Sequence, residues 1–191
     1  MPELYFTDWT YTMRDLVEGK LPEGEYDGCV FEQLVIPGAD LSRYHFLDCS
    51  FIGCNLGNVR LRNTSLKNVL FKDCKLTGMP FRDCHPFLFK IKLEQCKVDL
   101  ASFHGLPMKE TFFHDCDLHE ADFSGADLTG STFNRCDLSL AQFEETNLEK
   151  CDLRTALNFI IDPEKNRIRK CFFSLSGLTG LLGKYDLRIE P

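Results

Sequence analysis

Ten cysteines and five histidines are the residues of this 191-residue chain with the most versatile chemistry. Cysteine and histidine ligate zinc, and paired cysteines form disulfides, but each use needs a particular spacing. No Cys-x-x-Cys occurs, and the histidines share no common face of the repeat described below: His45, His85, His104, His114 and His119. The sequence therefore predicts no metal site, no disulfide framework and no cofactor.

One set of residues has the types used in nucleophilic hydrolysis: Asp99, His119 and Ser139 follow one another at intervals of 20. A Ser-His-Asp site also needs a pocket and donors for an oxyanion. We expect these three side chains to stack on an exposed wall instead. The chain also lacks a glycine-rich phosphate loop. We therefore predict no catalytic residue and a protein that is not an enzyme.

The interval of 20 arises from a five-residue repeat, clearest in residues 116–130. There, three consecutive segments each contain a small residue, Asp, Leu or Phe, and two polar or small residues. A period of five fits neither a helix nor a strand, so it indicates an internal repeat.

The large apolar residue of each repeat, here called its centre, can be followed along most of the chain. One register runs from Leu21 to Phe81, and a second, offset by two residues, runs from Leu88 to Leu153. The registers meet in residues 84–88, which we interpret as one short insertion with a proline bulge at Pro86. If each repeat forms one side of a square, four repeats close a coil of 20 residues with every centre pointing inward.

The residue two positions before each centre should also face inward, where space is narrow, and it is mostly small. Nine of the ten cysteines occupy this slot, and only Cys171 is expected to lie outside it. Cys96, Cys116 and Cys136 are one coil apart, which would stack them ~4.8 Å from one another. We therefore interpret the cysteines as buried, packing residues that behave as small hydrophobes.

This pattern resembles the pentapeptide-repeat family, whose repeat is a small residue, Asp or Asn, Leu or Phe, a polar residue, and Gly or any residue. Asp or Asn precedes the centre at Asp117, Asp122 and Asp127, and Gly follows two after it at Gly125 and Gly130. The resemblance implies an all-β solenoid, a right-handed quadrilateral β-helix, with a short C-terminal helix as its cap.

We expect three segments. Residues 1–20 lie outside the repeat and form an aromatic N-terminal cap with Tyr5, Phe6, Trp9 and Tyr11. Residues 21–158 form the β-helix, with a register break near 84–88. Residues 159–191 form a hairpin and a helix that cap the β-helix and join the dimer. The hairpin is expected around Asp162-Pro163 and the helix over residues 174–184, followed by a strand-like 187–189.

Charge divides the repeat into two halves. From Asp40 to Leu93 there are nine Lys or Arg against four Asp, whereas from Glu94 to Arg154 there are thirteen acids against five bases. Acids just before centres are expected to bond turn amides. Acids after centres are expected to face solvent as an acidic wall that binds a partner: Asp99, Glu120, Glu144, Glu145 and Glu149.

The C-terminal segment is more apolar than the end of one coil requires. An exposed apolar patch of this kind usually marks an interface. We predict a homodimer joined through this segment, with an interface of Phe172, Phe173, Leu175, Leu178, Leu181, Leu182 and Tyr185.

The uninterrupted coils, and residues 161–168 followed by a short helix, are similar to the Qnr, MfpA and McbG group. That resemblance implies a cytoplasmic dimer that mimics duplex DNA, binds DNA gyrase or topoisomerase IV, and protects it from quinolones or a peptide toxin. The long loops of Qnr are lacking, and only the two-residue insertion near Pro86 is present. The alternative is a non-catalytic scaffold for a different protein. We expect no direct nucleic-acid binding, because the aromatic centres are buried, and no membrane partner, because no apolar run approaches ~20 residues.

Overall fold

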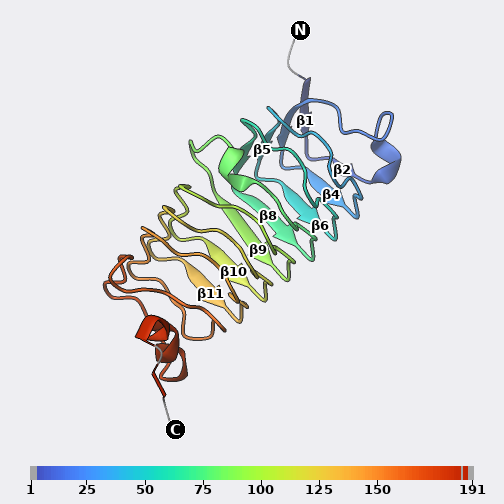
Figure 1. The fold of residues 1–191 in the computed structure, drawn as a ribbon. Helices are drawn as coiled ribbons and strands as arrows, with labels where there is room; N and C mark the ends of the chain where they lie inside the picture. Colours follow the sequence, from blue (N-terminus) through green and yellow to red (C-terminus); the bar gives the residue numbers. More distant parts are fainter. Residues whose placement is uncertain (1–3, 186, 189–191) are drawn as a thin grey trace.

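The computed structural model describes residues 4–185, 187 and 188, and it shows a rod of stacked coils with the N- and C-terminal segments at opposite ends (Figure 1). It is a right-handed quadrilateral β-helix, as expected. All pairs between its strands are parallel and join residues 20 apart, or 22 apart across the insertion, as in Phe51 with Phe71 and Phe71 with Leu93. Within the described residues, no helix combines the length and apolarity that a membrane crossing requires.

Short strands form two of the four sides. One sheet contains β1 (Leu4–Thr7), β3 (Gly24–Asp27), β5 (His45–Leu47) and β7 (Ser65–Lys67). The other contains β2 (Thr10–Tyr11), β4 (Val30–Glu32), β6 (Ser50–Ile52), β8 (Val69–Lys72), β9 (Ile91–Glu94), β10 (Phe112–His114) and β11 (Thr132–Asn134). The other two sides of each coil are joined mainly by isolated parallel bridges. Short 3-10 segments lie near the two ends of the chain: η1 (Met13–Asp15), η3 (Ser176–Leu181) and η4 (Gly183–Tyr185).

Four faces can be named from the centres that lie beneath them. The first face covers Tyr26, Phe46, Leu66, Met108, Leu128 and Leu148. The second covers Phe31, Phe51, Phe71, Leu93, Phe113 and Phe133. The third covers Leu56, Leu76, Val98, Leu118 and Leu138, and the fourth covers Leu61, Phe81, Phe103, Phe123 and Phe143. Every one of these centres is buried, which confirms the inward direction predicted from the repeat.

Aromatic centres stack directly over one another along the rod. On the second face Phe31 and Phe51 have ring centroids 4.4 Å apart, and on the fourth face Phe103 and Phe123 are 5.0 Å apart, both nearly parallel. Phe113 meets Phe123 edge to face at 5.9 Å. Offset stacks and edge contacts at these distances are the favoured geometries of aromatic pairs. The core is therefore a continuous column, with each coil packed only on its neighbours.

The small inward slots hold the cysteines. All ten are free in the described chain, nine are buried and Cys171 is partly buried. The insertion adds two residues between Cys74 and Cys96, so the expected stack of three thiols extends to five on the third face: Cys54, Cys74, Cys96, Cys116 and Cys136. The Sγ atoms of Cys54 and Cys74 each donate to a backbone carbonyl of the previous coil at 3.3 Å.

Cys171 was expected outside the slot, and that expectation was wrong. Its backbone N–H donates to Ile168, as that of Cys151 donates to Leu148, and Phe172 bridges Asp152 in parallel. Burial raises the pKa of the Cys171 thiol to about 12. The repeat therefore continues past residue 158, with Ile161 buried in the inward slot and Phe159 buried one residue after the position where the register places a centre.

The register break adds two residues, as predicted, but its centre was misassigned. Leu88 is 62% exposed and has φ 58°, whereas Phe89 is buried. Leu88 thus occupies a tight turn, and the neighbouring phenylalanine fills the core. The 3-10 turn η2 (Phe81–Asp83) precedes this loop.

The N-terminal segment also differs from the expectation. Residues 4–11 belong to the repeat, because β1 pairs in parallel with β3 and β2 with β4. Phe6 stacks on Tyr26 at 4.8 Å, and Tyr11 is buried, whereas Tyr5 and Trp9 are exposed. The segment is therefore a first coil rather than a separate aromatic cover.

The C-terminal hairpin is not formed in the described chain. Residues 159–173 continue the coil instead, because Arg167 bridges Asn147 in parallel. The expected helix is present as 3-10 segments, η3 and η4. Gly180 lies against the backbone of Phe159, where an added Cβ would approach the carbonyl oxygen to 2.2 Å, so η3 seals the last coil. Leu187 and Arg188 form no strand, and Ile189 lies outside the described residues.

Candidate partner-binding surface

Asp99, His119 and Ser139, which have the residue types of a hydrolytic site, are half-buried and bind different neighbours. Thr77 donates to the Asp99 carboxylate at 2.8 Å, Ser139 donates to Asp137 at 2.5 Å, and His119 Nδ1 lies 3.4 Å from Glu120. Asp99, His119 and Ser139 thus engage neighbours other than one another. Among the described residues, no group of three or more His, Cys, Asp or Glu is arranged to hold a metal ion.

Acids that precede centres bind their own turns, as predicted. The carboxylates of Asp117, Asp122, Asp127 and Asp137 each accept the backbone N–H two residues later, at 2.9 to 3.2 Å. These acids stabilise the corners of the coil, because a short polar side chain satisfies a turn amide that would otherwise face solvent.

Several acids of the second half are also paired with cations, either on a neighbouring coil or on their own. Arg135 binds Asp115 with two hydrogen bonds of 2.6 Å, and this guanidinium holds the pKa of Asp115 below its ordinary value. Hydrogen bonds from Arg154 likewise lower the pKa of Asp152. Lys109 lies 3.3 Å from Asp127. Part of the negative charge counted in the sequence is therefore neutralised locally.

The five acids proposed as one wall lie on three faces. Asp99 is on the third face, Glu120 is at the edge between the third and fourth faces, and Glu144 is on the fourth, as the backbone bonds to Gly78, Ser139 and Gly125 show. Glu145 follows at the next edge, and Glu149 is on the first face, where its carbonyl accepts from Gly130. Glu120, Glu144 and Glu145 are exposed, whereas Asp99 and Glu149 are half-buried.

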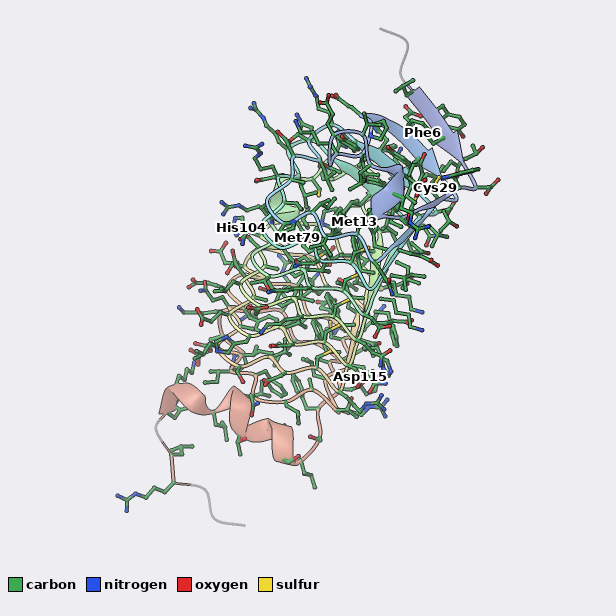
Figure 2. The ribbon with its side chains drawn as sticks, turned by 90° about the vertical axis from the view of Figure 1, so that its right-hand side faces the viewer. Phe6, Met13, Cys29, Met79, His104 and Asp115 are labelled. Atoms are coloured by element: carbon green, nitrogen blue, oxygen red, sulfur yellow. The ribbon has the colours of Figure 1, made fainter. Side chains whose placement is uncertain are left out.

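Asp99 and Glu120 therefore lie at the edge between the third and fourth faces, Glu144 and Glu145 lie at the other edge of the fourth face, and Glu149 lies beyond it on the first face. Glu144 also pairs with Lys165 at 2.9 Å. The view in Figure 2 shows how far apart side chains on different faces lie: His104, on the fourth face, and Asp115, at the edge between the second and third, project on opposite sides. A partner contacting one side of the rod meets only some of the five acids.

The C-terminal surface exposes most of the residues predicted for a dimer. Leu175 is 89% exposed, and Phe172, Leu178, Leu182 and Tyr185 are also exposed. Phe173 and Leu181 instead pack partly against the core, where they help to seal the last coil. The Arg154 guanidinium lies 5.5 Å from the ring centre of Phe172.

Sequence reasoning missed an exposed apolar ridge at the edge between the third and fourth faces. Leu100 and Leu140 occupy edge positions with φ 60° and 58°, and both are more than half exposed. In the repeat these residues stand two after a centre, in the slot that glycine fills elsewhere, so an apolar residue in that slot was the available signal.

Two family models match the chain: "Pentapeptide repeat region" over residues 25–103 and "Pentapeptide repeats (9 copies)" over residues 109–152. No curated protein sequence matches it. Among solved structures, a trypsin-treated variant of QnrB1, a plasmid-mediated fluoroquinolone resistance protein, is similar with a TM-score of 0.63 at 17% identity, covering 98% of each chain.

Full-length QnrB1 is similar with a TM-score of 0.48 at 16% identity, covering 97% of this chain and 98% of its own. HetL, a pentapeptide repeat protein involved in heterocyst differentiation regulation in the cyanobacterium Nostoc sp. strain PCC 7120, gives 0.36 at 16% identity and covers 92% of this chain and 86% of its own. The buried five-residue repeat, the stacked square coils and the two family matches together show that the chain belongs to the pentapeptide-repeat family.

Proposed function

We propose that this protein is a non-catalytic DNA mimic that binds DNA gyrase or topoisomerase IV in the cytoplasm and protects it from quinolones or a peptide toxin. The observation that carries the proposal is that acids border both edges of the fourth face on a rigid rod, Asp99 and Glu120 at one edge and Glu144 and Glu145 at the other. The fold likeness to QnrB1, which is named a fluoroquinolone resistance protein, supports the same class of function.

The spacing of the coils supports a fit between these acids and a groove that binds DNA. Parallel strands repeat at ~4.8 Å, whereas duplex DNA carries one phosphate charge per ~1.7 Å of its axis. The rod cannot equal that density, but Asp99, Glu120 and Glu144 lie on successive coils, so negative charge recurs from coil to coil around the fourth face and forms a strip. A basic groove attracts such a strip over about one Debye length, ~8 to 10 Å, so association is faster at low salt.

Reversing the acidic charges tests the proposal directly. The wild-type protein is expected to inhibit gyrase supercoiling, or to rescue it from a quinolone, at micromolar concentration. A variant with Lys at Asp99, Glu120, Glu144 and Glu145 is expected to lose about tenfold or more of this effect, because complementary charges drive encounter. The assay measures the concentration that changes supercoiling of a relaxed plasmid by half.

The matched control carries the same number of reversals in the other half of the rod, at Glu18, Glu25, Glu32 and Asp73. It has the same net charge as the test variant, so it separates a local contact from overall charge. Equal loss in both variants would remove Asp99, Glu120, Glu144 and Glu145 from the proposal.

The proposal includes a homodimer joined through the C-terminal surface. Leu175 is the most exposed of its apolar residues, and burying such side chains supplies most of the energy of a small interface. Leu175→Glu is expected to convert a dimer into a monomer in analytical ultracentrifugation at about 10 μM. The control is Leu157→Glu, which also replaces an exposed leucine but lies on the third face, and it should sediment as the wild type.

A second function remains supported by the same surface. In this alternative the rod is a non-catalytic scaffold for a different basic protein, since an acidic surface alone does not identify its partner. A wild-type protein that neither inhibits nor protects gyrase or topoisomerase IV would favour this alternative.

A further inference from the structure

The edge between the third and fourth faces changes character along the rod. In the first half its corner positions are Gly38, Asn58 and Gly78, which suit a left-handed backbone. In the second half the same positions are Leu100, Glu120 and Leu140, all with φ between 55° and 60°. A leucine in this conformation is disfavoured by contact between its Cβ and the following carbonyl.

These leucines gain no compensating burial. Leu100 is 53% exposed and Leu140 is 66% exposed. Ile160, which lines the same shallow depression as Leu140, is 63% exposed. At ~4.8 Å per coil, Leu100 and Leu140 are about 10 Å apart with Glu120 between them. The positions thus combine an unfavourable backbone with apolar surface in water, and neither property stabilises the isolated rod.

On the two faces that meet at this ridge, acids outnumber lysines. Asp99, Asp117 and Asp137 lie on the third face, and Asp122 and Glu144 lie on the fourth. The positive or titratable groups on the same stretch are Lys97, His104, His119 and Lys165, of which Lys165 is already paired with Glu144. The ridge is therefore an apolar strip inside an acidic border.

We propose that Leu100, Leu140 and Ile160 are the apolar anchors of the contact with the topoisomerase, and that this ridge enters a basic groove with an apolar floor. The inference rests on the proposed function and names the part of the rod that makes the contact. A second copy of this chain is a poorer occupant, because a two-fold contact along the edge would bring like acidic borders together. An anionic lipid surface is opposed by the same charges.

The test uses a substitution that tolerates the left-handed backbone conformation at these two corners. Asn58 already occupies the corresponding corner with φ 55°, so Leu100→Asn with Leu140→Asn should fold and should melt at the wild-type temperature or above it. Affinity for purified gyrase is measured for the full-length chain by fluorescence anisotropy. The double variant is expected to bind about tenfold or more weakly, since buried anchors dominate contact energies.

Leu88→Asn is the matched control. Leu88 is also a leucine with φ 58° and is 62% exposed, but it lies in the insertion loop, away from the ridge. It should bind gyrase as the wild type does. If the double variant binds as tightly as the wild type, the ridge inference is overturned and the proposed function stands.

If the wild-type protein itself does not bind gyrase, the proposed function and the ridge contact are both overturned. Sedimentation of the same variants tests whether a second copy of this chain occupies the ridge instead. A double variant that changes oligomeric state while keeping its affinity for gyrase would show that a second copy, rather than the topoisomerase, covers the ridge.

Discussion

Phe123→Ala is expected to lower the free energy of unfolding by about 3 to 5 kcal/mol, the largest effect of any single change considered for this rod. Phe123 is fully buried, and its ring stacks on Phe103 at 5.0 Å and on Phe143 at 5.3 Å. It also meets Phe113 and Phe133 edge to face. Truncation therefore removes contacts with three successive coils at once, and the square section cannot collapse to fill the space. Urea unfolding followed by circular dichroism measures the change.

The control for this prediction is Phe87→Ala. Phe87 is 64% exposed in the insertion loop, so its removal leaves the column of rings intact and should change the free energy of unfolding by less than about 1 kcal/mol. Similar losses for the two variants would mean that the stacked rings contribute no more than surface phenylalanines do.

Alkaline pH is expected to destabilise the rod steeply, with a loss of up to about 1.4 kcal/mol per pH unit for each fully buried thiol. Burial raises the pKa of Cys49 and of Cys151 to about 12, from an ordinary value of 9.0. Burial also raises the pKa of Cys84. Between pH 9 and pH 12 the unfolded chain releases these protons and the folded chain keeps them. Stability supplied by the neutral thiols is thus complete below pH 9 and is lost as the pH rises.

Urea unfolding at pH 8, 9, 10 and 11 in the presence of a reductant measures this slope. Replacing Cys49 and Cys151 by alanine provides the comparison, because alanine already fills the same inward slot at Ala121 and Ala126. The free energy of unfolding of this variant should fall less steeply with pH, because the contributions of Cys49 and Cys151 are absent. An unchanged slope would show that these thiols ionise alike in the folded and unfolded chains.

The regular part of the fold was predictable because each five-residue repeat repeats one physical requirement. Leu118, Phe123 and Leu128 are all fully buried, and the small residues before them face the same interior. Asp117 and Asp122 bond their turn amides as expected. Each repeat must bury its large apolar residue, fit its small residue into the narrow slot and place its acid at a turn amide. At constant spacing, one arrangement meets these three requirements.

The irregular parts were less predictable, because at them several residues compete for one position. Leu88 and Phe89 are adjacent apolar residues after Pro86, and periodicity alone chose the wrong one as the buried centre. Phe6 and Tyr11 follow the 20-residue spacing, but the surrounding residues lack the small and acidic members of the repeat. At the other end, Asp162-Pro163 indicated a hairpin, whereas parallel pairing with the coil beneath prevailed.

The candidate site was predicted in composition but not in arrangement. The sequence identifies the acids after centres, but which of them share an edge depends on their position within the coil of 20. Glu144 and Glu149 differ by one side of the square and so face different directions. The exposed leucines were overlooked because a pattern search treats apolar residues as interior by default.

The 20-residue offset between paired strands, which widens to 22 across the insertion, makes the chain a molecular ruler. Since each coil touches only the coils above and below it, whole coils can be gained or lost by duplication or deletion while both ends keep their own contacts. Each such event changes the separation between the C-terminal surface and the insertion loop, or between any two sites on the shaft, by a step of ~4.8 Å. In this architecture the distance between two sites on the rod therefore changes in fixed steps, independently of which side chains the coils expose.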